Sequence, residues 1–191
     1  MQRPLVAPAV EPVSISEVRA QCRIDADHTG EDTRLAGYIA ACRAAAEHIA
    51  GIRLITQTWQ LGLDDWPARG QIVLPETPVQ AIVSVGYITR AGAAQQLDSA
   101  AYRLDLRGSR GVVRPAYGTC WPSDSRADHG AIIVTYRVGF GDSGAAVPGS
   151  VREWILAHVT AMWENRGAGL SGQFVELPYL RTLLDAAKVY A

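Results

Sequence analysis

Four histidines are the residues of this 191-residue chain best suited to catalysis or metal binding. They lie far apart in the sequence, at His28, His48, His129 and His158. The chain contains no HExxH pair, no paired metal-ligand spacing and no GxSxG serine motif, so the common hydrolase arrangements are not indicated. His48 and His158 fall in predicted helices, and we interpret His158 as a hydrogen-bonded residue on an apolar helix face.

Two acidic loops carry the oxygen ligands that Ca²⁺ and Mg²⁺ prefer. One contains Asp64 and Asp65, and the other contains Asp124, Asp128 and His129. Their spacing matches no EF-hand loop, so we favour solvated loops over a metal site. A glycosidase-type carboxylate pair stays open, because such a pair forms in space and not in sequence. The sequence therefore predicts no catalytic residue, no cofactor and no metal.

The glycine-rich segment 139–144 does not read as a phosphate-binding loop. It has neither the Lys nor the Ser/Thr of a P-loop, and no βαβ pattern surrounds it, so we interpret it as a strand-to-helix connection. The three cysteines, Cys22, Cys42 and Cys120, are too few and too widely spaced for a disulfide framework. They predict reduced thiols, with Cys22 and Cys42 packed on helix faces.

The bulk composition is that of a globular protein. Hydrophobic residues make up 48% and charged residues 19%, which argues against global disorder. Lys and Arg total 18 against 19 Asp and Glu, so no overall basic charge favours nucleic acid. Charges interrupt every apolar stretch before it reaches the roughly 20 residues of a membrane-spanning helix. We therefore expect no membrane partner.

Helical patterns occupy both sides of the chain's centre. Ser14 and Glu17 have capping-box spacing and predict a helix over 15–22. A second helix begins at Asp32 or Thr33 and ends at Gly51, and a third begins at a capping box formed by Ser150 and Glu153 and ends near residue 166. The expected apolar faces of these two helices are Leu35, Ile39, Cys42, Ala46 and Ile49, and Val151, Trp154, Ile155, Val159 and Met162.

Between these helices the pattern changes to short alternating segments rich in β-formers, which predict strands. They are 55–63, 71–74, 81–88, 102–106, 111–114 and 131–138. The fold class is therefore α+β, a small helical bundle with an inserted antiparallel β-sandwich or barrel-like module. We expect a polyproline-like arm at 1–13, a helical domain at 14–53 and 148–166, the β module at 54–147, and a glycine hinge with a docking segment at 167–191.

The aromatic residues allow two interpretations. Trp59, Trp66 and Trp121 lie in or beside the β module, where core packing is favoured. The alternative is a ligand- or carbohydrate-binding β module in which these rings stack on sugar.

The last part of the chain carries an apolar run from Phe174 to Tyr190. A short helix on a glycine tether is marginal alone. It needs a surface to dock on, either the chain's own core or a partner's groove.

Taken in order, several segments resemble the head–tail connector, or adaptor, family of long-tailed phages and gene transfer agents. These segments are 11–17, 54–59, 74–75 with 78–82, 115–122 (Pro-Ala-Tyr-Gly-Thr-Cys-Trp-Pro), 138–141 and 147–166. No single motif is diagnostic, but the ordered combination is fairly specific. The resemblance covers roughly residues 11–166, and the region after Gly167 is less characteristic.

The resemblance implies a structural, non-enzymatic subunit of a homo-oligomeric ring, expected to be a dodecamer, beneath the portal protein. DNA would pass through its lumen without sequence-specific binding, and a stopper or other tail-side protein would bind the far face. The protein would be made in the host cytoplasm and reside at the head–tail junction of a virion or phage-like particle. The C-terminal segment would dock into the portal through Leu177, Tyr179, Leu180, Leu183, Leu184 and Tyr190.

Overall fold

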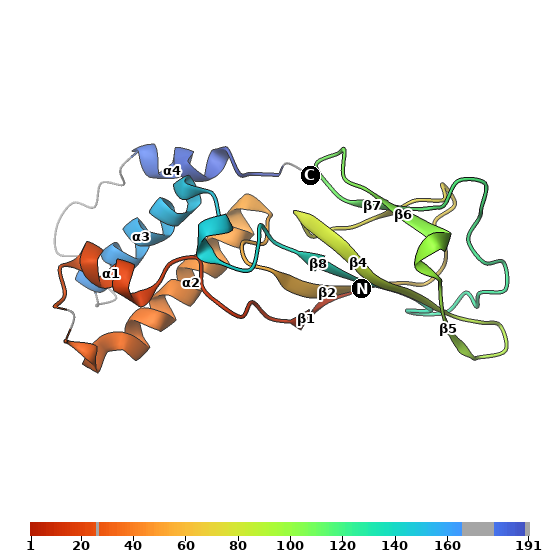
Figure 1. Ribbon diagram of the computed structural model, residues 1–191, viewed down its shortest axis with the longest axis horizontal. Helices are drawn as coiled ribbons and strands as arrows, with labels where there is room; N and C mark the ends of the chain where they lie inside the picture. Colours follow the sequence, from red (N-terminus) through yellow and green to blue (C-terminus); the bar gives the residue numbers. More distant parts are fainter. Residues whose placement is uncertain (26, 166–177, 190–191) are drawn as a thin grey trace. The chain divides into compact units, whose positions relative to one another are not determined.

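The computed structural model describes residues 1–25, 27–165 and 178–189, which form two compact units (Figure 1). The helical unit comprises Ala9–Ile55 and Gly141–Ala191, and the β unit comprises Met1–Pro8 and Thr56–Phe140. Each unit has its own cluster of buried apolar side chains. Among the helices described, none combines the length and the apolar character that crossing a membrane requires.

The described part of the helical unit contains α1 (Ile15–Cys22), α2 (Asp32–Ala50), α3 (Gly149–Glu164) and α4 (Pro178–Asp185). Helix α3 packs against the other three. The core forms where the apolar faces of α2 and α3 meet, with Leu35, Ile39, Val151 and Ile155 at most 1% exposed. Burying an aliphatic side chain of this size contributes about 1.5–3 kcal/mol, so this seam stabilises the unit.

The capping box predicted for α1 is confirmed. Glu17 N donates to Ser14 Oγ at 3.2 Å, and Ser14 N donates to Glu17 Oε2 at 2.7 Å. These bonds satisfy two backbone groups that the first helical turn leaves without partners. At the other end Arg23 adopts the left-handed conformation with φ 55° and closes the helix.

The capping box predicted at Ser150 is wrong. Helix α3 begins one residue earlier, at Gly149, with Pro148 as its N-cap and no side-chain cap. The amides of Val151 and Arg152 donate to the carbonyl of Pro148. Ser150 therefore lies inside the first turn, where its hydroxyl cannot act as the N-cap acceptor.

Two residues predicted to lie on apolar helix faces lie outside the core. Ile49 is 50% exposed and Met162 is 37% exposed. In each helix the position one residue further on takes the inward place: Ala50 is 1% exposed, and Trp163 packs against the core. The cause is the helical period of 3.6 residues, because after the preceding core residue the i+4 position faces inward better than i+3.

The β unit is an antiparallel sandwich of two sheets. The five-stranded sheet has the order β1-β2-β8-β4-β5 and the three-stranded sheet the order β3-β7-β6. Their strands are β1 (Gln2–Val6), β2 (Gln57–Leu63), β3 (Ile72–Val73), β4 (Val79–Ile88), β5 (Ala94–Gln96), β6 (Tyr102–Asp105), β7 (Val112–Pro115) and β8 (Ile132–Val138). As described, the larger sheet is open, with β1 and β5 at its edges, and is not a closed barrel.

The central strand β8 places its apolar residues on one face. Ile132, Val134, Tyr136 and Val138 are all fully buried, as the period of two along a strand requires. On β2, Trp59 lies opposite Tyr136 and supplies apolar surface to the same face. The smaller sheet supplies the other side of this core, including Val113, which is also fully buried.

The start of the chain differs from the polyproline-like arm predicted for it. Residues Gln2–Val6 form β1 and pair with β2, with Gln2 opposite Leu61. Gly62 N donates to Met1 O at 2.7 Å, and the Met1 amino group donates to Gly62 O at 2.9 Å. Pro4 is compatible with this pairing because β1 is an edge strand, where a missing backbone donor is tolerated.

Candidate functional site

Helix α4 carries the candidate site, and its apolar side is turned toward the core of its own unit. Leu184 is 1% exposed and belongs to that core, with Leu183, Ala187 and Val189 packed beside it. The backbone beyond the helix is also anchored, because Val189 N donates to Ala50 O at 3.0 Å. The segment therefore uses the helical unit as at least one of its docking surfaces.

The predicted docking residues divide into three groups. Leu183 and Leu184 face the core of the helical unit, whereas Tyr179 is 58% exposed and Leu180 is half-buried. Leu177 and Tyr190 lie outside the described residues. Of the predicted set, Tyr179 and Leu180 thus offer described surface on α4 to a partner.

The end of α2 helps to position the segment after α4. Gly51 terminates α2 in the left-handed conformation, with φ 67°, as the sequence predicted. A Cβ at this position would lie 3.3 Å from the carbonyl oxygen of Val189. Glycine therefore serves both the backbone conformation and the close approach of the later segment. The sequence indicates only the first of these roles, because the second depends on a contact between residues distant in sequence.

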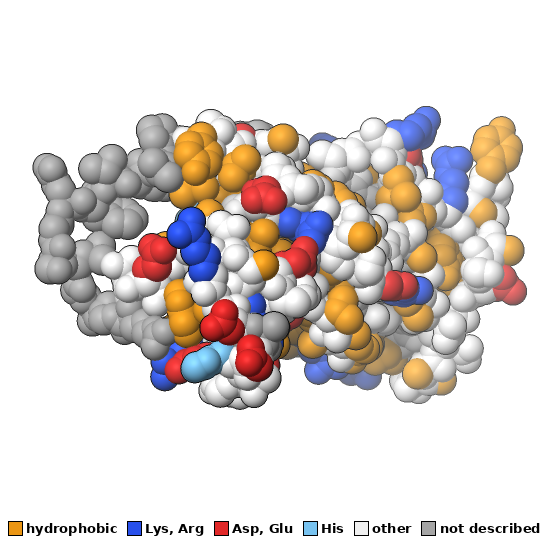
Figure 2. Space-filling model, turned by 60° about the vertical axis from the view of Figure 1, so that its left-hand side comes forward, with side chains coloured by type: hydrophobic (Ala, Val, Ile, Leu, Met, Phe, Trp, Pro, Cys, Tyr) orange, Lys and Arg blue, Asp and Glu red, His pale blue; other side chains and the backbone are white. Residues whose placement is uncertain are grey.

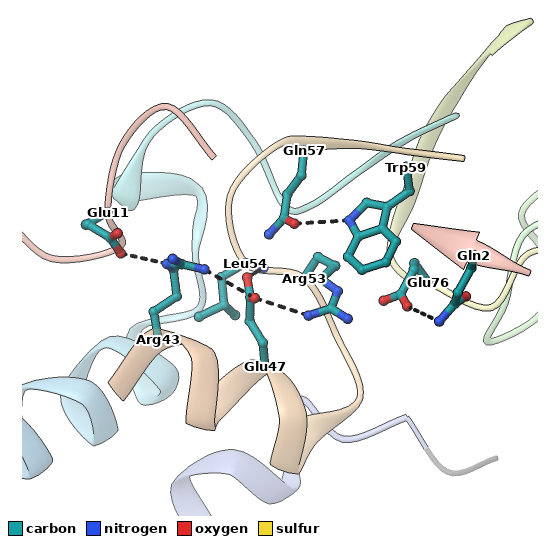
Figure 3. A network of polar contacts seen from close by, with 9 residues as sticks. All are labelled: Gln2, Glu11, Arg43, Glu47, Arg53, Leu54, Gln57, Trp59 and Glu76. Carbon is teal, nitrogen blue, oxygen red and sulfur yellow. Dashed lines mark hydrogen bonds and ion pairs between the residues drawn. The ribbon is translucent and has the colours of Figure 1, made fainter. Parts of the chain in front are cut away.

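A buried carboxylate at the end of α2 supports the same region, and the sequence analysis missed it. Glu47 is 4% exposed and accepts a hydrogen bond from the backbone N of Leu54 at 3.0 Å. Arg43 Nη1 lies 3.4 Å and Arg53 Nη1 3.3 Å from Glu47 Oε2, and Arg43 Nε also donates to Glu11 at 2.7 Å (Figure 3). The Arg43–Glu47 spacing of four residues was the available sequence signal.

Glu17 joins the start of α1 to α3. Beyond its capping bonds it forms an ion pair with Arg152, whose Nε donates to the carbonyl of Pro12 at 3.1 Å. The backbone amide of Ser14 is the largest cause of a lowered pKa for Glu17, and the Ser14 hydroxyl and Arg152 add to it. These bonds fix the segment entering α1 against α3, within the unit that carries α4.

The tryptophans of the β unit pack mainly against protein. Trp66 and Trp121 stack with ring centroids 4.6 Å apart and an interplanar angle of 5°, while Trp59 is buried and donates to Gln57 Oε1 at 3.0 Å. A ring that sugar is to stack on must present an open face. Trp66 and Trp121 each cover one face of the other and pack against the core of the β unit, and Trp59 is buried, so the carbohydrate-binding alternative gains no support.

The two acidic loops of the β unit come together. Asp64 Oδ1 accepts from Gly130 N at 2.9 Å and lies 3.2 Å from His129 Nδ1, while Asp128 pairs with Arg126 at 3.1 Å. The Gly130 amide is the largest cause of a lowered pKa for Asp64. Nowhere among the described residues do three His, Cys, Asp or Glu side chains form a group that could hold a metal ion. The contacts tie two loops of the sandwich together.

His158 lies on α3, where its Nδ1 is 2.8 Å from the carbonyl oxygen of Trp154 and its ring stacks on the Trp154 indole. This is the hydrogen-bonded structural position that the sequence indicated. It gives His158 a packing role in the helical unit.

Comparison with known proteins gives a family match. Residues 12–98 match the family model of phage gp6-like head-tail connector proteins. The resemblance seen in the sequence is thereby confirmed. The matched stretch includes α1, α2 and the strands β2 to β5, so it spans parts of both units. No curated protein sequence matches the chain.

Solved structures of gene transfer agent particles contain chains with the same fold. A chain from the neck of an empty gene transfer agent particle, computed with C6 symmetry, has a TM-score of 0.83 at 23% identity. Chains from a native gene transfer agent virion and from a native neck with C12 symmetry have TM-scores of 0.81 and 0.78, at 22% and 21% identity. Each comparison covers 100% of this chain and 96% of the other. The whole chain therefore shares the fold of these chains from gene transfer agent particles.

Proposed function

We propose that this protein is a structural subunit of a head–tail connector, located at the junction of capsid and tail in a phage-like particle. The observation that carries the proposal is the connector-family match over residues 12–98. Agreement in fold with neck chains over the whole length supports it. Its role is to join other proteins and involves no catalysis.

The working form of the protein is a homo-oligomeric ring. The C6 and C12 symmetries of the neck structures with this fold support this arrangement. A closed ring uses a heterologous interface, in which two different surfaces of the same chain meet in neighbouring copies. The portal protein would bind one side of the ring and a tail-side protein the other, while DNA passes through the lumen without sequence-specific contacts.

The proposed portal contact is the surface of α4 that carries Tyr179 and Leu180. Because the opposite side of α4 belongs to the core, a deletion is a poor test of this contact. Deleting residues 177–191 would remove Leu184 from the core, so a loss of binding would not distinguish docking from unfolding. A charge at Tyr179 is a sharper probe because this side chain is 58% exposed. A charge placed in an apolar contact must be desolvated without a partner, which weakens binding.

We expect Tyr179→Glu to weaken binding to the purified portal ring by about tenfold or more, with unchanged thermal stability. The matched control is Ile49→Glu, which adds the same charge at a 50% exposed apolar site on α2 of the same unit. Co-sedimentation with portal rings at several concentrations would measure both. If Tyr179→Glu and the wild type bind the portal equally well, α4 is not the portal contact. The connector role would then be tested separately, by whether the protein forms rings.

A further inference from the structure

Two arginines face each other on the outer side of the small sheet of the β unit. In the pairing of β6 with β7, Arg103 lies directly opposite Arg114, and Leu104 lies opposite Val113. Leu104 and Val113 contribute to the core, so the alternation of side chains places both arginines on the other face. Like charges directly opposite each other on one face of a sheet destabilise it, unless something neutralises them.

The carboxylate on this face is already engaged. Asp105 accepts from Arg107 Nε at 2.9 Å and from Arg107 Nη2 at 2.7 Å, a bidentate pair. Arg114 lies near enough to Asp105 to help lower the pKa of that carboxyl, but Arg107 is the larger cause. In the part of the chain that is described, neither Arg103 nor Arg114 forms an ion pair, and the Nε of Arg114 is buried without a hydrogen-bond acceptor. A buried donor without an acceptor costs free energy, so this arrangement is suited to an incoming anion.

Apolar side chains next to the arginines indicate what kind of anion fits. Val73 lies opposite Val112 on the same outer face and is 46% exposed, and nearby Leu106 is 51% exposed. Arginine beside exposed aliphatic groups is typical of protein interfaces. Contacts to nucleic-acid phosphates draw mainly on basic and polar donors. The face therefore fits an acidic segment of a protein better than DNA.

The chain itself contains an acidic partner for this face. The sequence of the β unit has nine Arg against seven Asp and Glu, a formal charge of +2, whereas the helical unit has nine Arg and Lys against twelve Asp and Glu, a formal charge of −3. Figure 2 shows several acidic side chains on the surface formed by the helical unit. The two units are thus oppositely charged.

The segment from Asp25 to Asp32, between α1 and the start of α2, carries four acidic side chains. Asp32 pairs with Arg19 and Glu31 with Arg34. Asp25 and Asp27 are exposed, and their carboxylates form no ion pair or hydrogen bond within the described residues. Two unpaired carboxylates therefore lie close together in the sequence of the helical unit, matching the two unpaired arginines of the β unit.

We infer that the outer face of β6 and β7 binds the α1–α2 loop of the neighbouring copy in the ring, with Arg103 and Arg114 paired to Asp25 and Asp27. This inference rests on the proposed connector ring and names one of its interfaces. The contact is heterologous, because an arginine face on one copy meets an acidic loop on the next, and repeating it around an axis closes a ring. It also supplies acceptors that the two arginines do not find among the described residues of their own chain.

A charge exchange tests the contact on the full chain. We expect Arg103→Glu with Arg114→Glu, and separately Asp25→Arg with Asp27→Arg, to weaken ring assembly by about tenfold or more, because like charges then meet. Combining all four substitutions restores opposite charges and should restore assembly. Ring formation on portal complexes would be counted by mass photometry and negative-stain electron microscopy.

The control is Arg69→Glu with Arg90→Glu, two exposed arginines that form no ion pair within the described residues; it makes the same change of charge elsewhere on the β unit and should leave ring assembly unchanged. If the glutamate variants fail to fold by circular dichroism, Arg103→Gln with Arg114→Gln keeps the test open, with a smaller loss expected. Rings that assemble normally with either charge-reversed pair would overturn the inference. A loss of ring assembly in both charge-reversed pairs that the fourfold variant does not restore would also overturn it. The same holds if the arginine substitutions change DNA retention and not ring assembly. If the wild type forms rings and any of these results is found, this interface alone is refuted. If the wild type forms no ring, the connector proposal is refuted.

Discussion

The helical unit and the β unit stabilise themselves in different ways. The helical unit encloses a charged residue, Glu47, between two arginines and a backbone amide. The β unit also buries a carboxylate, Glu76, which is 7% exposed and accepts a hydrogen bond from Gln2 Nε2 at 3.0 Å (Figure 3). Its bidentate pair of Arg107 and Asp105 lies instead on the outer face of the small sheet, with the Arg107 side chain 87% exposed. The units therefore differ in where their arginines lie: two arginines pair with the buried carboxylate of the helical unit, whereas the Arg107 pair of the β unit lies on an outer face that a partner can reach.

Replacing one carboxylate in each unit should separate these roles with the largest effect. We expect Glu47→Ala to destabilise the helical unit by about 3–5 kcal/mol, because it leaves two arginines facing an emptied buried site and Leu54 N without its acceptor. Asp105→Asn should lower the unfolding midpoint far less, because the side chain of its partner Arg107 is 87% exposed and solvent screens the pair. Urea unfolding followed by circular dichroism measures both, and equal losses would contradict the contrast.

Matched core substitutions should show that each unit has its own core. Leu35 in the helical unit and Leu74 in the β unit are both fully buried, so each change to Ala should cost about 3 kcal/mol. Cys42 reports on the helical unit, since burial raises the pKa of its thiol to about 11 and keeps it unreactive while folded.

We therefore expect Leu35→Ala to speed modification of Cys42 by a thiol reagent, and Leu74→Ala to leave that rate close to the wild-type value. The exposed Cys120 should react first in every variant and serves as the internal reference. Equal acceleration of Cys42 by both substitutions would show that the two units unfold together.

The smallest expected effect concerns pH and the helical unit. The folded-state pKa of Glu17 is lowered, so its contribution to stability is present above the ordinary carboxyl pKa of 4.5 and is lost as pH falls through the folded value. Glu17→Gln should flatten this acid-side loss of stability in thermal scans from pH 6 to pH 3. A variant with the wild-type pH dependence would assign the acid sensitivity to other carboxylates.

Local signals predicted much of the fold. The boundaries of α1 follow from Ser14 and Glu17, and the end of α2 follows from Gly51, because capping chemistry acts within a few residues. The strand β8 has the clear alternation of a half-buried strand, and its prediction is confirmed. These features needed no knowledge of the rest of the chain.

Features that depend on distant partners were missed. Strand β1 exists because its backbone pairs with β2 more than fifty residues later, and its prolines pointed to an unpaired arm. Strand β5, with the sequence Ala-Gln-Gln, has no apolar alternation and forms by pairing with the end of β4. The burial of Glu47 and the facing of Arg103 and Arg114 likewise follow from packing and register, which no local pattern encodes.

For the docking surface on α4, the sequence predicted the helix but not which of its side chains would be exposed. The sequence indicated an amphipathic C-terminal helix, and α4 is present. Which of its residues face the core was decided by α3 and by the end of α2, so Leu184 became a core residue while Tyr179 stayed exposed. The portal contact proposed here rests on that second group.

Electron microscopy of the purified protein, alone and mixed with its portal ring, tests the connector role most directly. We expect a closed ring with six- or twelvefold symmetry seated on one face of the portal, with the β6–β7 face of each copy against the α1–α2 loop of the next. A protein that stays monomeric in the presence of portal, and leaves the portal ring bare even when it is in large molar excess, would contradict the connector role.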